Sequence, residues 1–222
     1  MLRVEGLIVR RWGLRLYVER LEVAGRLVLL GRNGAGKSTL LATLAGLYRP
    51  SAGKVYMEGM EVTDLPPERR GIGYLPQHPA RLPLRPRRAL EYFSRRWGVD
   101  YMPFVRRLGA GGLLEKQALS DGEQQLLNLC ILLMREPRCL LLDEPTSHLD
   151  WENRRVVWAA LRELDLPLLL VTHDPLEALL VGERAALLKD GLVRGPIALN
   201  TADAREAIGA RLDLYGLLEG LG

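Results

Sequence analysis

The segment RLVLLGRNGAGKST, residues 26–39, contains the glycine-rich loop that decides the fold. Its last nine residues match the pattern G-x-x-x-x-G-K-[ST], directly after an apolar run typical of a strand and directly before a helical pattern. Glycines let the backbone wrap closely, so that successive N–H groups point inward, and the start of the next helix adds positive potential. The segment therefore predicts a loop that binds phosphate groups. The alternative is a glycine-rich turn that carries a lysine by chance.

Residues 31–39, called the phosphate loop below, carry the side chains that a nucleoside triphosphate needs. Lys37 is expected to reach the outer phosphates, and Ser38 is expected to supply an oxygen to Mg²⁺. The residues expected to contact the nucleotide are Gly31, Asn33, Gly34, Ala35, Gly36, Lys37, Ser38 and Thr39. A phosphate loop by itself leaves kinases, GTPases and many ATPases open.

Two further apolar runs have the same form, and helical patterns separate the three. CLLLDE, residues 139–144, and PLLLVTHD, residues 167–174, are short and continuously apolar before they end in polar residues. Such runs are typical of strands buried on both faces of a parallel sheet. The fold class expected is therefore α/β, a P-loop NTPase core with a mainly parallel sheet. Residues 1–17 and 52–62 alternate more and predict an antiparallel β flank.

The carboxylates after the second apolar run predict the metal side of the site. Asp143 ends the run and can hold the Mg²⁺ shell, and Glu144 is placed to activate a water molecule for attack on the γ-phosphate. The alternative is a strand end that acidic residues merely cap.

The middle of the chain loses strand character and predicts a helical subdomain inserted into the α/β core. Residues 79–112 hold four prolines and eight arginines, and Pro86 is a typical first residue of a helix. The expected organisation is a first part of the core at 1–78, the helical subdomain at 79–135, and the second part of the core at 136–222. Residues 201–222 are expected to form one or two C-terminal helices.

The segment LSDGEQQ, residues 119–125 and called the signature segment below, has two interpretations. Ser120 and Glu123 form a capping box, which predicts only the start of a helix. The segment could instead be half of a nucleotide site whose other half lies on another chain.

Composition and charge limit the remaining possibilities. The chain has 222 residues, of which 48% are hydrophobic, and a net charge of +4, an ordinary globular balance. No apolar run approaches the ~18 residues needed to span a bilayer, and the N-terminus is too charged for a signal peptide. We therefore expect a soluble, cytoplasmic chain in which Cys130 and Cys139 are buried, reduced thiols.

With these residues in place, almost the whole chain resembles the nucleotide-binding subunit of an ABC transporter. Six motifs occur in the family's order. They are GRNGAGKST (31–39, Walker A), YLPQ (74–77, Q-loop), LSDGEQQ (119–125, signature), CLLLDEP (139–145, Walker B), SHLD (147–150, D-loop) and VTHD (171–174, switch histidine). Any one of them is a weak signal, whereas six in order are very specific.

The resemblance implies a role for each motif. Gln77 and Asp143 would organise Mg²⁺ and water, Glu144 would act as the base, and His173 would steady the γ-phosphate. The signature segment would face the γ-phosphate held by a partner chain, through Ser120, Gly122 and Glu123.

The family pattern leaves the roles of three positions open. Trp12 stands where the family stacks an aromatic side chain on adenine, or else it is a surface or edge-strand residue. Asp121 and Glu123 depart from the usual signature, and they should weaken dimer closure unless they point away from ATP or pair with arginine.

The function implied is that of an ATP-binding and ATP-hydrolysing subunit that uses ATP and Mg²⁺ and drives transmembrane transport by ATP-dependent dimerisation. Its expected partners are a second ATP-binding subunit, identical or different, and transmembrane permease subunits, with no nucleic acid. The expected location is the inner face of the cell membrane, through the permease. The alternative is a soluble ABC ATPase that acts on ribosomes or DNA, although such proteins usually have two cassettes or long coiled-coil insertions.

Overall fold

The short apolar runs form the parallel centre of a mixed ten-stranded sheet in the computed structural model, which describes residues 1–11, 13–78 and 80–199. The strands there lie in the order β9-β3-β8-β7-β6, and all four neighbouring pairs are parallel. Their bounds are Arg26–Leu30 for β3, Ile72–Leu75 for β6, Cys139–Asp143 for β7, Leu168–Val171 for β8 and Arg184–Lys189 for β9. The α/β core predicted from the sequence is confirmed.

The remaining strands form the antiparallel flank of the same sheet. β1 pairs antiparallel with both β2 and β4, whereas β10 pairs parallel with β2 and antiparallel with β9. The bounds are Leu2–Arg11 for β1, Leu14–Val23 for β2, Ala52–Met57 for β4, Met60–Glu61 for β5 and Leu192–Ala198 for β10. The flank was predicted for residues 1–17 and 52–62, and the structure extends it through β2 and β10.

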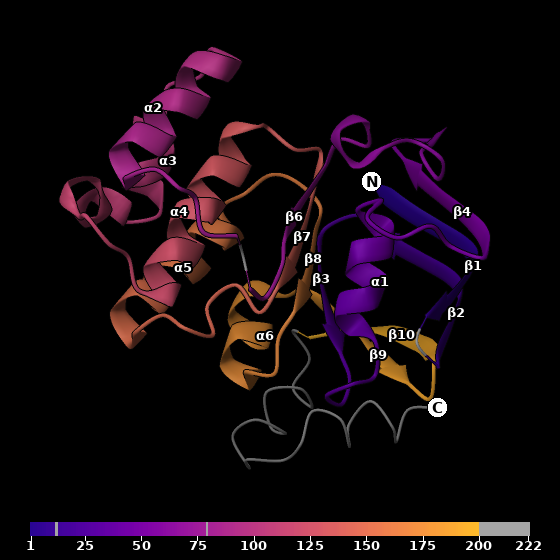
Figure 1. Cartoon of the computed structure of the whole chain (residues 1–222). Helices are drawn as coiled ribbons and strands as arrows, with labels where there is room; N and C mark the ends of the chain where they lie inside the picture. Colours follow the sequence, from indigo (N-terminus) through magenta and orange to yellow (C-terminus); the bar gives the residue numbers. More distant parts are fainter. Residues whose placement is uncertain (12, 79, 200–222) are drawn as a thin grey trace.

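Alternate residues of the central strands face two hydrophobic clusters on opposite faces of the sheet. Leu141 and Leu169 belong to one cluster together with the helix α1 (Lys37–Leu44) and the flank. Leu140 and Leu168 belong to the other. Figure 1 shows α1 between the central strands and the flank, while α5 and α6 lie on the other side. Because both faces are covered, every side chain of β7 and β8 is buried.

The helices of the second face follow directly from the strand ends. α5 spans Trp151–Arg162 and α6 spans Pro175–Val181, each with an aspartate N-cap, Asp150 and Asp174. On α5 the side chain of Trp158 is buried, with 2% exposed, whereas that of Val156 is 40% exposed.

A group of helices lies between the end of β6 and the start of β7 in the chain, where the sequence predicts an inserted subdomain. It contains α2 (Pro86–Trp97), α3 (Met102–Arg107), the 3₁₀ helix η2 (Ala110–Glu115) and α4 (Asp121–Met134). Another 3₁₀ helix, η1 (Pro67–Arg69), precedes β6. α2 begins with a proline and ends at Gly98, whose φ of +69° is the left-handed cap that glycine favours. In Figure 1 these helices lie to one side of the sheet, and α4 connects them to it.

Other expectations can be settled only where the structure describes the chain. Cys130 and Cys139 are free and buried, as predicted. No helix of the described ranges is long and apolar enough to cross a membrane. Trp12 and the C-terminal helices expected at 201–222 lie outside the described residues.

Candidate nucleotide site

The phosphate loop joins β3 to α1, and its glycines are required by close packing. A Cβ added to Gly36 would lie 2.7 Å from a methyl group of Leu14, and Gly36 has a φ of +100°. A Cβ on Gly31 would lie 2.6 Å from the carbonyl oxygen of Leu188. A side chain at Gly31 would meet the backbone of β9, and one at Gly36 would displace the side chains of Leu14 and Leu16 at a strained positive φ, so both glycines have a steric cause.

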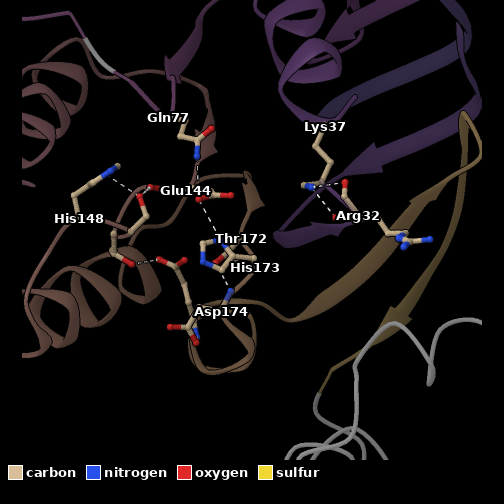
Figure 2. Close-up of polar contacts among 12 residues, drawn as sticks. Arg32, Lys37, Gln77, Glu144, His148, Thr172, His173 and Asp174 are labelled. Carbon is tan, nitrogen blue, oxygen red and sulfur yellow. Dashed lines mark hydrogen bonds and ion pairs between the residues drawn. The ribbon is translucent and has the colours of Figure 1, made fainter. Parts of the chain in front are cut away.

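Lys37, the first residue of α1, is held inside the loop. Its Nζ donates to the carbonyl oxygen of Gly31 at 2.6 Å and to that of Arg32 at 3.1 Å (Figure 2). The side chain is buried, and burial lowers the pKa of Lys37, while the carboxylates of Glu144 and Asp143 oppose this shift. A sheltered ammonium group that has only carbonyl oxygens as its hydrogen-bond partners is suited to bind an anion.

Asp143 and Glu144 stand where β7 ends. Asp143 is 2% exposed. Burial raises the pKa of Asp143, a hydrogen bond from Ser38 lowers it, and the charge of Glu144 raises it further. Glu144 has a φ of +50°, which is strained for a residue other than glycine. Its N–H donates to Val171 at 2.8 Å, and its carbonyl oxygen accepts from Ser147 Oγ at 3.1 Å.

Gln77 and His173 both contact the carboxylate of Glu144. Gln77 Nε2 donates to Glu144 Oε2 at 3.2 Å, and His173 Nδ1 lies 3.1 Å from the same oxygen. Figure 2 shows both side chains pointing at Glu144, with Lys37 beyond it. These residues follow β6, β7 and β8, whose carboxyl ends meet at one edge of the sheet, where open α/β sheets bind ligands.

One pocket of about 580 Å³ brings together most of the residues predicted for the phosphates and the metal, although Gly31 and Ala35 do not line it. It is lined by Leu14, Asn33, Gly34, Gly36, Lys37, Ser38, Thr39, Gln77, Asp143, Glu144 and His173. Ala35 lines an adjoining pocket of about 490 Å³, which also includes Leu14, Asn33 and Gly34. The pocket has one cation at the loop and two carboxylates facing it, which is the charge arrangement that a metal–triphosphate complex requires.

The signature segment begins α4 and is a helix cap, as predicted. Glu123 N–H donates to Ser120 Oγ at 3.3 Å, and Ser120 N–H donates to Glu123 Oε2 at 3.0 Å. Ser120, Gly122 and Glu123 do not line the pocket of their own chain in the part that the structure describes. The same chain therefore does not bring the signature segment to its own phosphate loop.

The two unexpected acids of the signature segment are paired with cations. Asp121 forms an ion pair with Arg81, and Glu123 forms one with Lys116. Burial opposes ionisation of Glu123, but bonds from Lys116 and Ser120 outweigh it and lower the pKa of Glu123. The sequence left open whether these acids would pair with arginine. In the structure Asp121 pairs with an arginine, and Glu123 pairs with a lysine.

Contacts within the same chain require a glycine at position 122. A Cβ at this position would lie 2.2 Å from the carbonyl oxygen of His148 in the D-loop. The backbones of α4 and the D-loop thus touch at this point, and any larger residue would push them apart.

The sequence interpretation missed two residues that support the site. Gln125 Nε2 donates to the carbonyl oxygen of Glu144 at 2.8 Å, so α4 holds the backbone next to the carboxylate. Glu177 lies buried behind His173 and bonds to Thr146 and Trp158. Two features of the sequence could have pointed to these residues. Gln125 is one of two adjacent glutamines in the first turns of an otherwise apolar helix, and Glu177 comes three residues after the helix cap Asp174.

Comparisons with known proteins agree with this geometry. The sequence profile of the family described as "ABC transporter" matches residues 16–147. The chain is 41% identical over 180 residues to the molybdate/tungstate import ATP-binding protein of Archaeoglobus fulgidus, covering 75% of this chain and 74% of that protein. It is 36% identical over 206 residues to the sulfate/thiosulfate import ATP-binding protein of Mycobacterium tuberculosis, covering 84% of this chain and 54% of that protein.

A solved structure described as the ATP-binding subunit of an ABC transporter has the same fold. It superposes with a TM-score of 0.80 at 26% identity and covers 99% of this chain and 98% of its own. The chain therefore belongs to the ABC transporter family, as an ATP-binding subunit that hydrolyses ATP to power transport.

Proposed function

We propose that the 580 Å³ pocket binds ATP with Mg²⁺ and that its residues have the separate roles that the motifs suggest, in binding phosphates, binding the metal and activating water. Lys37 and the backbone N–H groups of the phosphate loop hold the outer phosphates. Ser38, Asp143 and Gln77 offer a hydroxyl, a carboxylate and an amide oxygen. Such hard oxygen donors suit Mg²⁺, which proteins commonly bind through one or two carboxylates and the substrate phosphates.

The fit to Mg²⁺ rests on Asp143. Burial holds its pKa above the ordinary value although Ser38 and Lys37 partly stabilise the carboxylate, so a bound cation would stabilise it further. When bound, Mg²⁺ would neutralise the negative charge that develops on the phosphates.

Glu144 is proposed as the base that accepts a proton from the attacking water. Among the described residues, Gln77 and His173 both contact Oε2 of Glu144, and Oε1 has no partner. The two contacts hold the carboxylate in one orientation and leave Oε1 to receive the proton. The 13% exposure of the Glu144 side chain allows a water molecule to reach it.

The signature segment is proposed to act on a second copy of the chain or on a related subunit. Ser120 is exposed at the N-terminus of α4, where the helix supplies positive potential and N–H donors. Its Oγ accepts the capping bond, so its hydroxyl hydrogen remains available to a phosphate oxygen. Because Arg81 and Lys116 pair with the nearby acids, the segment can approach a triphosphate without strong repulsion.

The transport process is proposed to be the import of a tetrahedral oxyanion. The relatives reported above are named for importing molybdate or tungstate and sulfate or thiosulfate. Permease subunits would form the pathway across the membrane, and this chain would work beneath them on the cytoplasmic side. Cells that lack the chain should lose uptake of labelled molybdate, tungstate or sulfate and regain it with the wild-type chain. Unchanged uptake of all three would contradict the import proposal.

The nucleotide proposal is tested by Lys37→Ala, with Lys54→Ala as its control. Lys54 lies on β4, where its ammonium group is exposed and pairs with Glu61. By calorimetry, Lys54→Ala should have the same Kd for ATP as wild type, and the Kd of Lys37→Ala should be at least tenfold higher. EDTA should stop hydrolysis in all three. Equal ATP affinity in all three proteins would show that the loop does not hold the triphosphate.

A further inference from the structure

Glu177 is a carboxylate buried behind the catalytic pair, and the proposed mechanism does not use it. It lies on α6 and is 1% exposed. Its Oε1 accepts from Thr146 Oγ1 at 2.6 Å and from Trp158 Nε1 at 3.0 Å. Thr172 lines the same small pocket as Glu177, and hydrogen bonding from its hydroxyl lowers the pKa of Glu177.

Two of the partners of Glu177 come from the loops that carry pocket residues, whereas Trp158 lies on α5. Thr146 is two residues after Glu144, in the segment that leads into the D-loop. Thr172 is directly before His173, and its Oγ1 also accepts from the N–H of Asp174 at 3.0 Å. Glu177 therefore joins the loop after β7 to the loop after β8, and it lines one pocket with Glu144 and His173, which lie 3.1 Å apart.

A buried carboxylate contributes less to the stability of a core than an apolar side chain does, so packing alone does not explain Glu177. Burial raises the pKa of Glu177, and the bonds from Thr146, Thr172 and Trp158, with the charge of Arg154, only partly oppose this. Apolar residues of similar volume often stabilise a core better than a buried charged group. The directional bonds of Glu177 do, however, fix the relative position of two loops, which apolar packing would do less strictly.

We propose that Glu177 is a positioning residue for ATP hydrolysis, which holds the Glu144 loop and the His173 loop at their working separation. The same bonds tie the start of the D-loop to the switch-histidine loop, so that a shift of one loop moves the other. The inference rests on the proposed roles of Glu144 and His173. It predicts that loss of the Glu177 bonds slows the chemical step without weakening ATP binding.

The test compares Glu177→Gln with variants of its threonine partner. Glu177→Gln keeps the shape of the side chain and replaces one acceptor oxygen by a donor NH₂ group. Thr146→Val removes the hydroxyl at constant shape, and Thr146→Ser keeps it. Glu177→Gln and Thr146→Val should each lower kcat by about 10- to 100-fold, the effect expected from a misplacement of about 1 Å. The KM and Kd for ATP should stay within about twofold of wild type, and Thr146→Ser should restore kcat.

The double variant separates positioning from general loss of stability. If Glu177 and Thr146 act through one bond, Glu177→Gln combined with Thr146→Val should be no slower than the slower single variant. Thermal melting of every protein, with Glu152→Gln on the exposed start of α5 as control, identifies variants that are simply unfolded. If Glu177→Gln does not fold, Thr146→Val and Thr146→Ser still carry the test.

Two results would overturn the inference. One is wild-type kcat in folded Glu177→Gln and Thr146→Val, and the other is effects that multiply in the double variant. Glu144→Gln, measured in parallel, keeps the two proposals apart. If Glu144→Gln loses turnover and Glu177→Gln does not, only the positioning role fails. If Glu144→Gln retains turnover, the proposed role of Glu144 fails first.

Discussion

At the scale of single residues, the pocket contains a carboxylate that works against folding. The raised pKa of Asp143 means that the folded chain binds this proton more tightly than the unfolded chain does. The charged form therefore destabilises the fold at pH values above the raised pKa. The destabilisation disappears as the pH falls below the ordinary value of 3.8.

Asp143→Asn should consequently raise the melting temperature of the ligand-free chain at pH 8. The gain should be about 2–4 °C for each ~1 kcal/mol of relieved charge burial in a chain of this size, and it should shrink as the pH approaches ~4. Thermal melting of both proteins from pH 4 to pH 8 measures this. A lower melting temperature for Asp143→Asn at pH 8 would mean that Lys37 and Ser38 already compensate the carboxylate in full.

Arg70 is a buried cation that holds the far end of the phosphate-loop helix. Its guanidinium donates to the carbonyl oxygens of four residues and has no carboxylate within ion-pair distance in the described chain. These are Thr43 at 3.2 Å, Leu44 at 2.9 Å, Thr63 at 2.5 Å and Leu65 at 2.9 Å. The first two are carbonyl oxygens at the C-terminus of α1, where a cation also meets the negative end of the helix dipole, and that of Thr43 additionally accepts from the N–H of Gly46 at 3.0 Å.

Arg70→Met should lower the free energy of unfolding by about 3–5 kcal/mol, because the buried carbonyl oxygens would lose their donors. The neighbouring Arg69, which is exposed, gives the matched control Arg69→Met, expected within about 0.5 kcal/mol of wild type. Urea unfolding of the three proteins measures the difference. Equal stability of the two variants would show that water replaces the guanidinium at little cost.

At the scale of elements, α4 shows why a cap and a binding segment can share one sequence. The capping bonds require Ser120 and Glu123, and close contact with the D-loop requires Gly122. These intrachain causes explain the residues without any partner. A test must therefore separate loss of the cap from loss of a contact across a dimer.

Ser120→Ala and Ser120→Asp make that separation. Ser120→Ala should cost about 0.5–2 kcal/mol of stability, and Ser120→Asp should be nearly neutral, because aspartate caps as well as serine does. If the segment also faces a partner's triphosphate, Ser120→Asp should still bind ATP but lose hydrolysis, since like charges repel strongly in a water-poor interface. Melting temperature, ATP binding and ATPase rate are measured on the same protein. Normal ATPase activity of Ser120→Asp would show that Ser120 is only a helix cap and does not face a partner's triphosphate.

The sequence predicted the elements that depend on local patterns. The apolar runs before Gly31 and Asp143 became β3 and β7, Pro86 began α2, and Ser120 capped α4. It could not predict contacts that tertiary packing creates. Examples are the bond from Gln125 to the Glu144 backbone and the four carbonyl oxygens around Arg70. Such contacts depend on how separate elements pack together, and no short sequence pattern predicts them.

At the scale of the whole molecule, the pocket proposed for ATP and the signature segment proposed to act on a partner are separate. The pocket residues lie at the carboxyl edge of the sheet, whereas Ser120 is exposed at the start of α4 and does not line that pocket. A head-to-tail pair of subunits would bring each signature segment to the other subunit's phosphate loop. Binding and hydrolysis should therefore be separable, because each subunit holds ATP by itself and only the pair completes the site.

The most direct measurement of the central claim is ATP turnover by Glu144→Gln, with Glu152→Gln as control. The substitution removes the base and keeps its shape, so ATP affinity by calorimetry should be unchanged. The hydrolysis rate should fall by about 10²–10⁴-fold, the usual contribution of a general base. With ATP and Mg²⁺, the variant should accumulate as a dimer in size-exclusion chromatography with light scattering, whereas wild type should return to the monomer as ATP is consumed. Wild-type turnover by Glu144→Gln would contradict the account, because the carboxylate between Gln77 and His173 would then not be the base.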